Sequence, residues 1–294
     1  MPILPCEAFV TGTAAHVLSA GRTRLRDAGL PDPATDARRL LAFVMGVPGA
    51  RLTLHLQDPL TADAVQRFEA AIEARLRRQP VAQIVGGRQF WGRWFNVTPD
   101  VLDPRPETET LIAAALEKPA LRILDLGTGS GCILLTLLAE WPDATGCALE
   151  ASPAALAVAR SNAEALSLTQ RATFQLGDWT RPGWAGALEG PFDLIVSNPP
   201  YVTHSEMADL EADVLDWEPH MALSPGGDGL DAYRAIIPAL RGLLTPTGRV
   251  LLEIGPTQGA QVSDLAAAGG LENVQLLPDL DSRDRVVLAH NFAK

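Results

Sequence analysis

The stretch Arg122-Ile123-Leu124-Asp125-Leu126-Gly127-Thr128-Gly129-Ser130-Gly131 decides the fold. We interpret residues 122–126 as a strand and residues 131–140 as a helix, so the glycines fall in the loop between them. Glycine lets a backbone adopt positive φ and approach a ligand closely. Strands and helices alternate from this loop onward, which is typical of a parallel sheet with crossover helices. The sequence therefore predicts an α/β, Rossmann-like domain with a ligand at this loop.

The expected sheet is mostly parallel and has seven strands. Each predicted strand is a short apolar run, and each predicted helix carries apolar residues at helical spacing. The strands are expected at 122–126, 146–149, 172–176, 192–196, 249–254, 274–277 and 285–289. The crossover helices are expected at about 131–140, 153–166, 232–243 and 259–268.

Two segments of different character precede this domain. Residues 1–83 carry apolar residues three and four positions apart, which predicts a small N-terminal helical domain. Its basic run Arg75-Leu76-Arg77-Arg78 ends a predicted helix, and we expect these side chains to be solvated. Residues 84–105 have glycine turns between strand-like runs and predict a β-hairpin linker. The α/β domain then covers residues 106–294.

The composition is typical of a soluble protein from a reducing compartment. Cys6, Cys132 and Cys147 form no Cys-x-x-Cys pair, which argues against a disulfide framework and a zinc site. The five histidines lack metal-ligand spacing, so no metal is expected. No apolar run reaches membrane-spanning length, and residues 1–6 lack the pattern of a signal peptide. We therefore expect a cytoplasmic protein without membrane contact.

Charge is distributed unevenly along the chain. The net charge is −11, and residues 182–233 contain ten acidic residues but no Lys or Arg. A groove for nucleic acid needs the opposite sign, because phosphates are bound by Lys and Arg. This interval therefore predicts a partner other than nucleic acid.

The spacing of the glycine loop separates two kinds of cofactor site. A dinucleotide fingerprint is Gly-x-Gly-x-x-Gly, but Cys132 and Leu134 stand where its third glycine would be. The observed Gly-x-Gly-x-Gly spacing disfavours a pyrophosphate and favours another nucleoside-like ligand. Glu150 ends the second strand, where a carboxylate can accept hydrogen bonds from both ribose hydroxyls. That role fits NAD and S-adenosylmethionine equally, since both contain an adenosine ribose.

Asp178 and Trp179 follow the third predicted strand. An aromatic face can stack on a base, and a carboxylate can accept a hydrogen bond from an amino group. A tryptophan packed in the core is the competing interpretation. The pair is a candidate contact for an adenine ring.

The second candidate site is the run Asn198-Pro199-Pro200-Tyr201, which follows the apolar strand 192–196. Ligands of open α/β sheets bind beyond the carboxyl ends of the strands. Proline has no N–H, so the carbonyls here are rigid acceptors. The Asn198 side chain adds another acceptor and Tyr201 adds a flat ring, which together suit a planar NH2 group. A proline-rich turn that simply ends the strand is the alternative.

Several motifs together resemble those of the class I S-adenosylmethionine-dependent methyltransferases. The closer resemblance is to the protein-glutamine N5-methyltransferases of peptide chain release factors, and it covers most of the chain. It is carried by Phe90-Trp91-Gly92, Pro104-Arg105-Pro106-Glu107-Thr108-Glu109, the glycine loop, Asn198-Pro199-Pro200-Tyr201, Glu218-Pro219 and Gly226-Gly227-Asp228-Gly229-Leu230-Asp231. The Asn-Pro-Pro-Tyr motif is shared with DNA adenine and rRNA guanine methyltransferases. Its combination with Pro-Arg-Pro-Glu-Thr-Glu is far more specific.

The resemblance implies a class I methyltransferase fold and S-adenosylmethionine as cofactor, with S-adenosylhomocysteine as product. It implies methyl transfer to the side-chain nitrogen (N5) of the glutamine in a release factor's Gly-Gly-Gln motif, with residues 1–83 recognising that protein. Asn198 and Pro199 would accept the hydrogens of the amide and Tyr201 would pack on its plane. Asn198 would also border the cofactor, and Pro200 and Glu107 would contact the substrate.

Two positions depart from the family pattern, and three other functions remain open. Asp103 stands where an apolar residue is usual, and Glu150 replaces the usual Asp with a longer carboxylate. The alternatives are an amino methyltransferase of DNA or RNA bases, a nicotinamide oxidoreductase and a non-catalytic binding module. We expect a monomer that acts on protein, not on nucleic acid.

Overall fold

The computed structural model describes residues 10–291, and it divides into two compact units. The helical unit runs up to Gly86 and includes the later segment Ala212–Trp217. The sheet unit comprises Gly87–Glu211 and the chain from Glu218 onward. Cys6 and residues 1–6, on which two of the predictions rest, lie outside the described residues. The boundary at Gly86 falls three residues beyond the expected end of the helical domain.

The helical unit is largely helical, as the sequence predicts. Its elements are β1 (Val10–Thr13), α1 (Ala14–Asp27), α2 (Pro33–Met45), η1 (Gly49–His55), β2 (Pro59–Thr61), α3 (Ala62–Leu76), α4 (Val81–Val85) and α8 (Ala212–Leu215). Asp32 caps α2 by accepting the N–H of Thr35 at 3.4 Å, and Pro33 is the first helical residue. The antiparallel pair β1–β2 was not predicted, because strands of four and three residues are too short to show alternation.

One predicted strand is wrong. Ile84 and Val85 were expected in the hairpin, but they end helix α4. Pro80 precedes that helix with φ −58°, and Gly86 ends it in the left-handed conformation with φ 80°. Proline before a short helix and glycine after it are helix signals, but we interpreted Gly86 as part of a hairpin turn. The hairpin itself is shorter and begins at Gly87.

Arg75 is also not solvated as predicted. Its side chain is buried, and its Nε lies 2.7 Å from Asp36 Oδ2 in α2. Its Nη2 lies 2.6 Å from Asp213 Oδ2 in the segment Ala212–Trp217. The Trp217 indole donates to the carbonyl of Arg77 at 3.1 Å. The segment 212–217 is therefore part of the polar core of the helical unit, although it is distant in sequence.

The sheet unit begins with a hairpin and continues as alternating strands and helices. Its elements are β3 (Gly87–Phe90), β4 (Arg93–Asn96), η2 (Pro106–Thr108), α5 (Glu109–Leu116), β5 (Arg122–Leu126), α6 (Cys132–Glu140), β6 (Thr145–Glu150), α7 (Pro153–Ala165), β7 (Ala172–Leu176), η3 (Trp184–Ala187), β8 (Phe192–Ser197), η4 (Glu206–Asp209), α9 (His220–Leu223), α10 (Asp231–Leu243), β9 (Leu244–Glu253), α11 (Gly259–Ala268), β10 (Glu272–Pro278) and β11 (Asp284–His290). All seven predicted strands and all four predicted crossover helices are present.

The seven strands form one sheet in the order β10-β11-β9-β8-β5-β6-β7. Neighbours from β9 to β7 are parallel, whereas β11 pairs antiparallel with both β9 and β10. The mostly parallel sheet of seven strands is therefore confirmed. The chain reverses its direction of winding between β5 and β8, and such switch points are where open sheets bind ligands.

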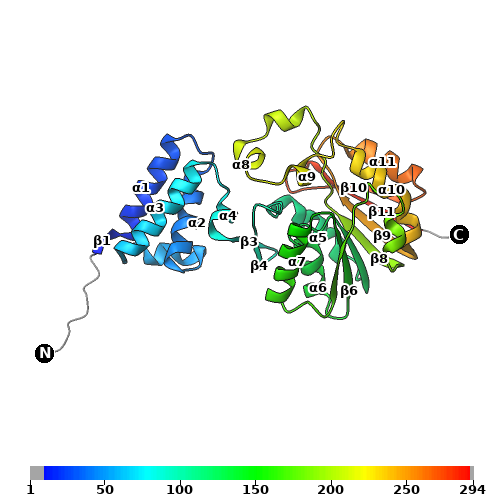
Figure 1. Cartoon of the computed structure of the whole chain (residues 1–294), viewed down its shortest axis with the longest axis horizontal. Coiled ribbons are helices and arrows are strands. Elements are labelled where there is room, and N and C mark those ends of the chain that lie inside the picture. Colours follow the sequence, from blue (N-terminus) through cyan, green and yellow to red (C-terminus); the bar gives the residue numbers. More distant parts are fainter. Residues whose placement is uncertain (1–9, 292–294) are drawn as a thin grey trace. The chain divides into compact units, whose positions relative to one another are not determined.

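Helices cover both faces of the sheet (Figure 1). Helices α5 and α6 pack on one face through residues such as Leu111, Leu134 and Leu138, which are fully buried. Helices α10 and α11 pack on the other face through Ile236, Leu240 and other apolar residues. With both faces covered, the central strands are buried and largely apolar, which is why they are visible in the sequence as short apolar runs.

Candidate functional site

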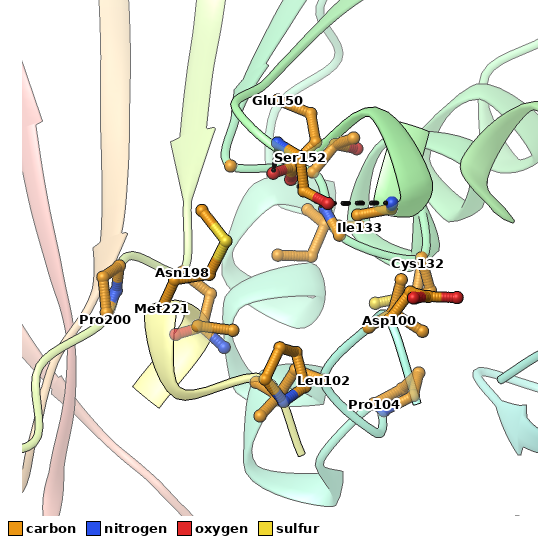
Figure 2. Close-up of a pocket in the computed structure, with 18 of the residues that line it drawn as sticks. Asp100, Leu102, Pro104, Cys132, Ile133, Glu150, Ser152, Asn198, Pro200 and Met221 are labelled. Atoms are coloured by element: carbon orange, nitrogen blue, oxygen red, sulfur yellow. Dashed lines mark hydrogen bonds between the residues drawn. The ribbon is translucent and has the colours of Figure 1, made fainter. Parts of the chain in front are cut away.

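A cavity of about 830 Å³, its open mouth included, lies beyond the carboxyl ends of β5, β6 and β8. Figure 2 shows Glu150 and Ser152 at one end, with Asn198 and Pro200 at another. The residues of the glycine loop and of the proline motif that line it are Gly127, Thr128, Gly129, Ser130, Asn198 and Pro200. The structure therefore brings together the two motifs that the sequence singled out.

The glycine loop needs its three glycines for conformational reasons. Gly127, Gly129 and Gly131 all have positive φ, at 73°, 54° and 82°. The N–H groups of Gly127 and Thr128 both donate to the carbonyl of Leu149, at 2.8 and 3.2 Å. The loop thus wraps around the end of β6. Gly131 does not line the cavity but forms the N-cap of α6.

Glu150 lies at the end of β6 and lines the cavity, as predicted for a ribose ligand. Its side chain holds the loop as well, because Oε2 accepts the N–H of Gly129 at 2.9 Å. Its Oε1 accepts the N–H of Ser152 at 2.9 Å. A carboxylate has about four acceptor positions, so each oxygen keeps one for a hydroxyl group.

A second carboxylate, Asp125, is buried beneath the loop. Its Oδ2 accepts the Thr128 hydroxyl at 2.7 Å, and the side chain is fully buried. Burial raises the pKa of Asp125 to about 7, against the opposing effect of that hydroxyl. Asp125 therefore supports the loop from within, and the sequence analysis gave it no role.

Of the pair after β7, only Trp179 lines the cavity. A Cβ on Gly127 would lie 2.8 Å from Trp179 Cη2, so the ring packs directly on the glycine loop. Asp178 Oδ1 accepts the N–H and the hydroxyl of Thr180, at 2.8 and 2.7 Å. That turn lowers the pKa of Asp178 and directs its carboxylate to its own loop. A contact of Asp178 with a base remains a prediction.

Asn198 lies directly after β8, next to the glycine loop. The preceding Ser197 donates its hydroxyl to the carbonyl of Leu126 at 2.7 Å, which joins the ends of β8 and β5. The Asn198 amide Nδ2 donates to Thr108 Oγ1 at 3.5 Å. Because the nitrogen is engaged in this way, Oδ1 is the atom left to accept a hydrogen bond.

Three other predicted residues do not line the cavity: Pro199, Tyr201 and Glu107. Burial, with the nearby Glu253 carboxyl, raises the pKa of Tyr201 to about 12, so its ring is neutral near pH 7. Glu107 is partly exposed, and its Oε1 lies 3.9 Å from Arg283 Nη2. Their contacts with a substrate remain predictions.

The segment Pro104–Glu109 contacts several distant parts of the sheet unit. Arg105 lines the cavity, and its Nη2 lies 2.7 Å from both carboxylate oxygens of buried Glu218. Glu109 accepts the N–H of Trp91 in the hairpin at 2.8 Å. Asp103, one of the two departures from the family pattern, is buried and lies 2.6 Å from Arg88 Nη1. Arg88 therefore compensates the charge that replaces an apolar residue.

Several carboxylates of the acidic interval are engaged by other groups of the chain. Glu206 accepts the N–H and the hydroxyl of Thr203, at 3.0 and 2.8 Å. Asp228 and Asp231 both pair with Arg234. Asp209 and Glu211 are exposed. The interval therefore presents fewer free carboxylates than its composition indicates, and its preference for protein over nucleic acid remains a prediction.

Several cavity residues were not identified from the sequence. They come from the segment before the proline-rich motif, from the turn between β6 and α7 and from the short helix α9, and they include Asp100, Leu102, Ala151, Ser152, Met221 and Ala222. Met221 is 56% exposed, which is unusual for a large apolar side chain beside a cavity. Short irregular segments carry no periodicity, so no sequence signal marks these positions.

Within residues 10–291, no group of three or more His, Cys, Asp or Glu side chains is arranged to hold a metal ion. None of the helices in that range is long and apolar enough to cross a membrane.

The chain is similar to known methyltransferases along nearly all of its length. Residues 16–86 match the model of the PrmC N-terminal domain, and residues 103–229 match that of the methyltransferase small domain. The release factor glutamine methyltransferase of Cereibacter sphaeroides is 58% identical, over 94% of this chain and 98% of its own. The protein of the same name from Rhodospirillum rubrum is 44% identical, over 95% of this chain and 85% of its own.

Solved structures share the fold at low sequence identity. A methyltransferase from Pyrococcus furiosus matches with a TM-score of 0.51 and 16% identity, over 69% of this chain and 91% of its own. The catalytic domain of hMettl16, solved with the MAT2A 3′UTR hairpin 6, matches with a TM-score of 0.57 and 17% identity. That match covers 73% of this chain and 82% of the other. At such identities the likeness establishes the fold alone.

Proposed function

The chain belongs to the release factor glutamine methyltransferases, and from this premise we propose that it methylates the Gly-Gly-Gln glutamine of peptide chain release factors. The methyl group comes from S-adenosylmethionine and goes to the side-chain amide nitrogen, N5. One observation supports the proposal most strongly: Asn198, with Oδ1 left to accept, lines the same cavity as the glycine loop.

The residues present fit S-adenosylmethionine. Gly129 has no atom within 4 Å of the position of a Cβ, so the loop is open where a ligand would approach. Glu150 keeps one acceptor position on each carboxylate oxygen for the two ribose hydroxyls. Trp179 offers a ring at the cavity wall. Glu150, the residue that departs from the usual Asp, is thus well placed for the ribose.

The acceptor motif is proposed to act by positioning the glutamine amide, without a strong acid or base. When bound, S-adenosylmethionine supplies a methyl group on a sulfonium, which is a good leaving group. An amide nitrogen is a poor nucleophile because its lone pair is delocalised into the carbonyl. Asn198 Oδ1 and the Pro199 carbonyl are proposed to accept its two hydrogens, so that the lone pair turns toward the methyl carbon. Positioning of this kind can supply much of the rate enhancement.

The proton balance needs no dedicated base. As the N–C bond forms and the S–C bond breaks, the nitrogen becomes positively charged and strongly acidic, so it loses a proton after transfer. The raised pKa of Tyr201, about 12, keeps the phenol neutral at working pH. Tyr201 is therefore proposed to act by packing against the amide, and not as a base.

The proposal includes the finer points of partner and place. The substrate is a folded protein, the helical unit contributes to its recognition, and the enzyme acts as a monomer in the cytoplasm. Exposed Asp209 and Glu211 favour a basic protein loop over the phosphates of nucleic acid.

Mass spectrometry of the product tests this function. The protein is incubated with release factor and S-adenosylmethionine carrying a labelled methyl group, and the peptide containing Gly-Gly-Gln is sequenced. We expect one methyl group on the glutamine side chain and none on a release factor whose glutamine is replaced by glutamate. Parallel incubations with DNA and ribosomal RNA should remain unlabelled. Label on nucleic acid and none on release factor would overturn the proposal.

A further inference from the structure

One sequence motif has no role in the site described so far. Gly226-Gly227-Asp228-Gly229-Leu230-Asp231 helps to carry the family resemblance, yet none of its residues lines the cavity. In the fold its last glycine, Gly229, lies against the backbone of Tyr201 in the acceptor motif. Gln258, in the loop after β9, meets both of them.

Gln258 is a buried amide that joins three separate loops. Its Oε1 accepts the N–H of Gly255 at 3.0 Å. Its Nε2 donates to the carbonyl of Tyr201 at 2.9 Å and to that of Gly229 at 3.4 Å. These partners determine the orientation of the amide. The Gly255 N–H needs an acceptor, so it faces Oε1, and the two carbonyls need a donor, so they face Nε2.

The peptide groups of Tyr201 are thereby held on both sides. Its N–H and that of Val202 donate to the carbonyl of Leu223, at 3.1 and 2.9 Å. Its C=O accepts from Gln258, which belongs to a different loop from Leu223. Tyr201 therefore cannot shift without breaking a bond to one of two independent segments.

Gly229 fits this arrangement only as glycine. Its φ is 78°, and a Cβ would lie 2.3 Å from the carbonyl oxygen of Tyr201 and 2.7 Å from Gln258 Nε2. Contacts below 3.0 Å require the backbone to move, in addition to the strain of positive φ. The glycine-rich motif at residues 226–231 thus lets its own backbone lie directly against that of Tyr201 in the acceptor motif.

We propose that Gln258 is a positioning residue for methyl transfer, which holds the Tyr201 backbone against Gly229 and so fixes the proposed amide-packing ring. This inference rests on the proposed function of the Asn198–Tyr201 motif. Gln258 does not line the cavity, so its effect is proposed to pass through Tyr201. A shift of about 1 Å in a positioning group can cost about 10²-fold in rate.

The test removes the donors while keeping the shape of the side chain. Gln258→Met is expected to lower kcat by about 10- to 100-fold, on the scale of a misplaced positioning group. The affinity for S-adenosylhomocysteine should change by less than about 2-fold, because the glycine loop makes no bond to Gln258 in the structure. Gln258→Glu, which keeps the acceptor for Gly255, is the second variant if the first does not fold.

Asn291 offers a matched control within the same unit. It is also a buried amide, and its Nδ2 donates to the carbonyls of Arg241, Leu244 and Thr245, at 3.4, 3.4 and 3.0 Å. Arg241 lies near the end of α10, and Leu244 and Thr245 begin β9, at the amino end of the strand, whereas the cavity lies beyond the carboxyl ends of the strands. Asn291→Leu therefore removes an equivalent bridge away from the motif, and its kcat should stay within about 2-fold of wild type.

Hydrogen exchange supplies a readout that does not depend on the acceptor. The peptide containing Tyr201 and Val202 should exchange its amide hydrogens faster in Gln258→Met than in wild type. In Asn291→Leu the exchange rate of this peptide should be unchanged. Equal kcat in the two variants at a temperature where both are folded, with unchanged exchange at Tyr201, would overturn the inference. If wild-type protein fails to methylate release factor, the proposed function fails, whereas the exchange experiment still decides the role of Gln258.

Discussion

The two ends of the cavity are supported by very different parts of the chain. The glycine loop is held by Asp125, Leu149, Glu150 and Asn162, all within about 40 residues of one another. The acceptor motif is held by Thr108, 90 residues before it, and by Gln258, 57 residues after it. The cofactor end is thus supported locally by β5, β6, α7 and the segments between them, whereas the acceptor end is supported by segments that are distant in the sequence.

Each end also contains a buried carboxylate. Asp125 lies under the glycine loop and accepts the Thr128 hydroxyl. Glu253, at the end of β9, is fully buried beside Tyr201 and Thr108. Burial raises the pKa of each to about 7, although the Thr108 hydroxyl partly lowers that of Glu253. These carboxylates let each end be perturbed separately.

The largest effect is expected at the acceptor end. Asn198→Ala removes the acceptor that lines the cavity, and turnover should fall by about 10²-fold or more, as for one positioned transition-state partner. Cofactor affinity should change by less than about 3-fold, since the loop bonds remain intact. The measurements are steady-state methylation of release factor and calorimetry with S-adenosylhomocysteine. Turnover within a few-fold of wild type would reduce Asn198 to a strand cap.

Next in size is a pH effect on stability from Glu253. The native pKa of about 7 exceeds the ordinary value of 4.5, so the native state binds more protons than the unfolded state between these values. Stability should therefore fall as pH rises from about 4.5 to 7 and stay level above it. Glu253→Gln removes this fall and should be more stable than wild type at pH 8 by about 3 kcal/mol. Asp125 contributes the same pH dependence of stability to wild type and to Glu253→Gln. The difference in stability between the two proteins therefore reports on Glu253 alone.

Denaturant unfolding at pH 5 and pH 8 measures this difference. Parallel pH dependences for Glu253→Gln and wild type would show that the carboxylate at the acceptor end is ionised or solvated in the native protein. The affinity for S-adenosylhomocysteine serves as the control and should be unchanged.

A smaller effect is expected at the cofactor end. Glu150→Ala removes the proposed ribose acceptor and the bond to Gly129, and should weaken S-adenosylmethionine binding by about 10-fold, or 1.4 kcal/mol. Glu150→Gln keeps one acceptor oxygen, so its affinity for S-adenosylmethionine should lie between those of wild type and Glu150→Ala. Calorimetry with S-adenosylmethionine and NAD gives the comparison. Tight NAD binding without S-adenosylmethionine binding would contradict the assignment of this end.

The smallest effect concerns substrate association. Asp209→Lys and Glu211→Lys reverse exposed charges without breaking a bond shown in the structure, whereas Glu206 is engaged by Thr203. The double variant should slow association with release factor by a few-fold at low salt and much less at high salt. Stopped-flow measurements over a salt series test this. Faster association of the lysine variant would indicate an acidic docking surface on the release factor.

The same contrast explains what the sequence could predict. Strand β5, strand β8 and the glycine loop are each a continuous stretch of sequence. Apolar runs therefore identified the strands, and glycine spacing identified the loop. Gln258, Met221 and Thr108 come from irregular or short segments, and only the fold brings them to the site. The partnership of Asp103 with Arg88 was equally hidden, because a cross-segment ion pair leaves no local pattern. Ile84 and Val85 were misassigned because Gly86 was interpreted as a hairpin turn, whereas it ends a short helix.

Single-turnover methyl transfer to release factor at saturating S-adenosylmethionine tests the separation of the two ends most directly. In Glu150→Ala, saturation should restore the rate to within about 3-fold of wild type, because only binding was weakened. In Asn198→Ala, the rate should stay about 10²-fold low at any cofactor concentration. Recovery of Asn198→Ala at saturating cofactor, with Glu150→Ala remaining slow, would contradict the assignment of one end to the cofactor and the other to the glutamine.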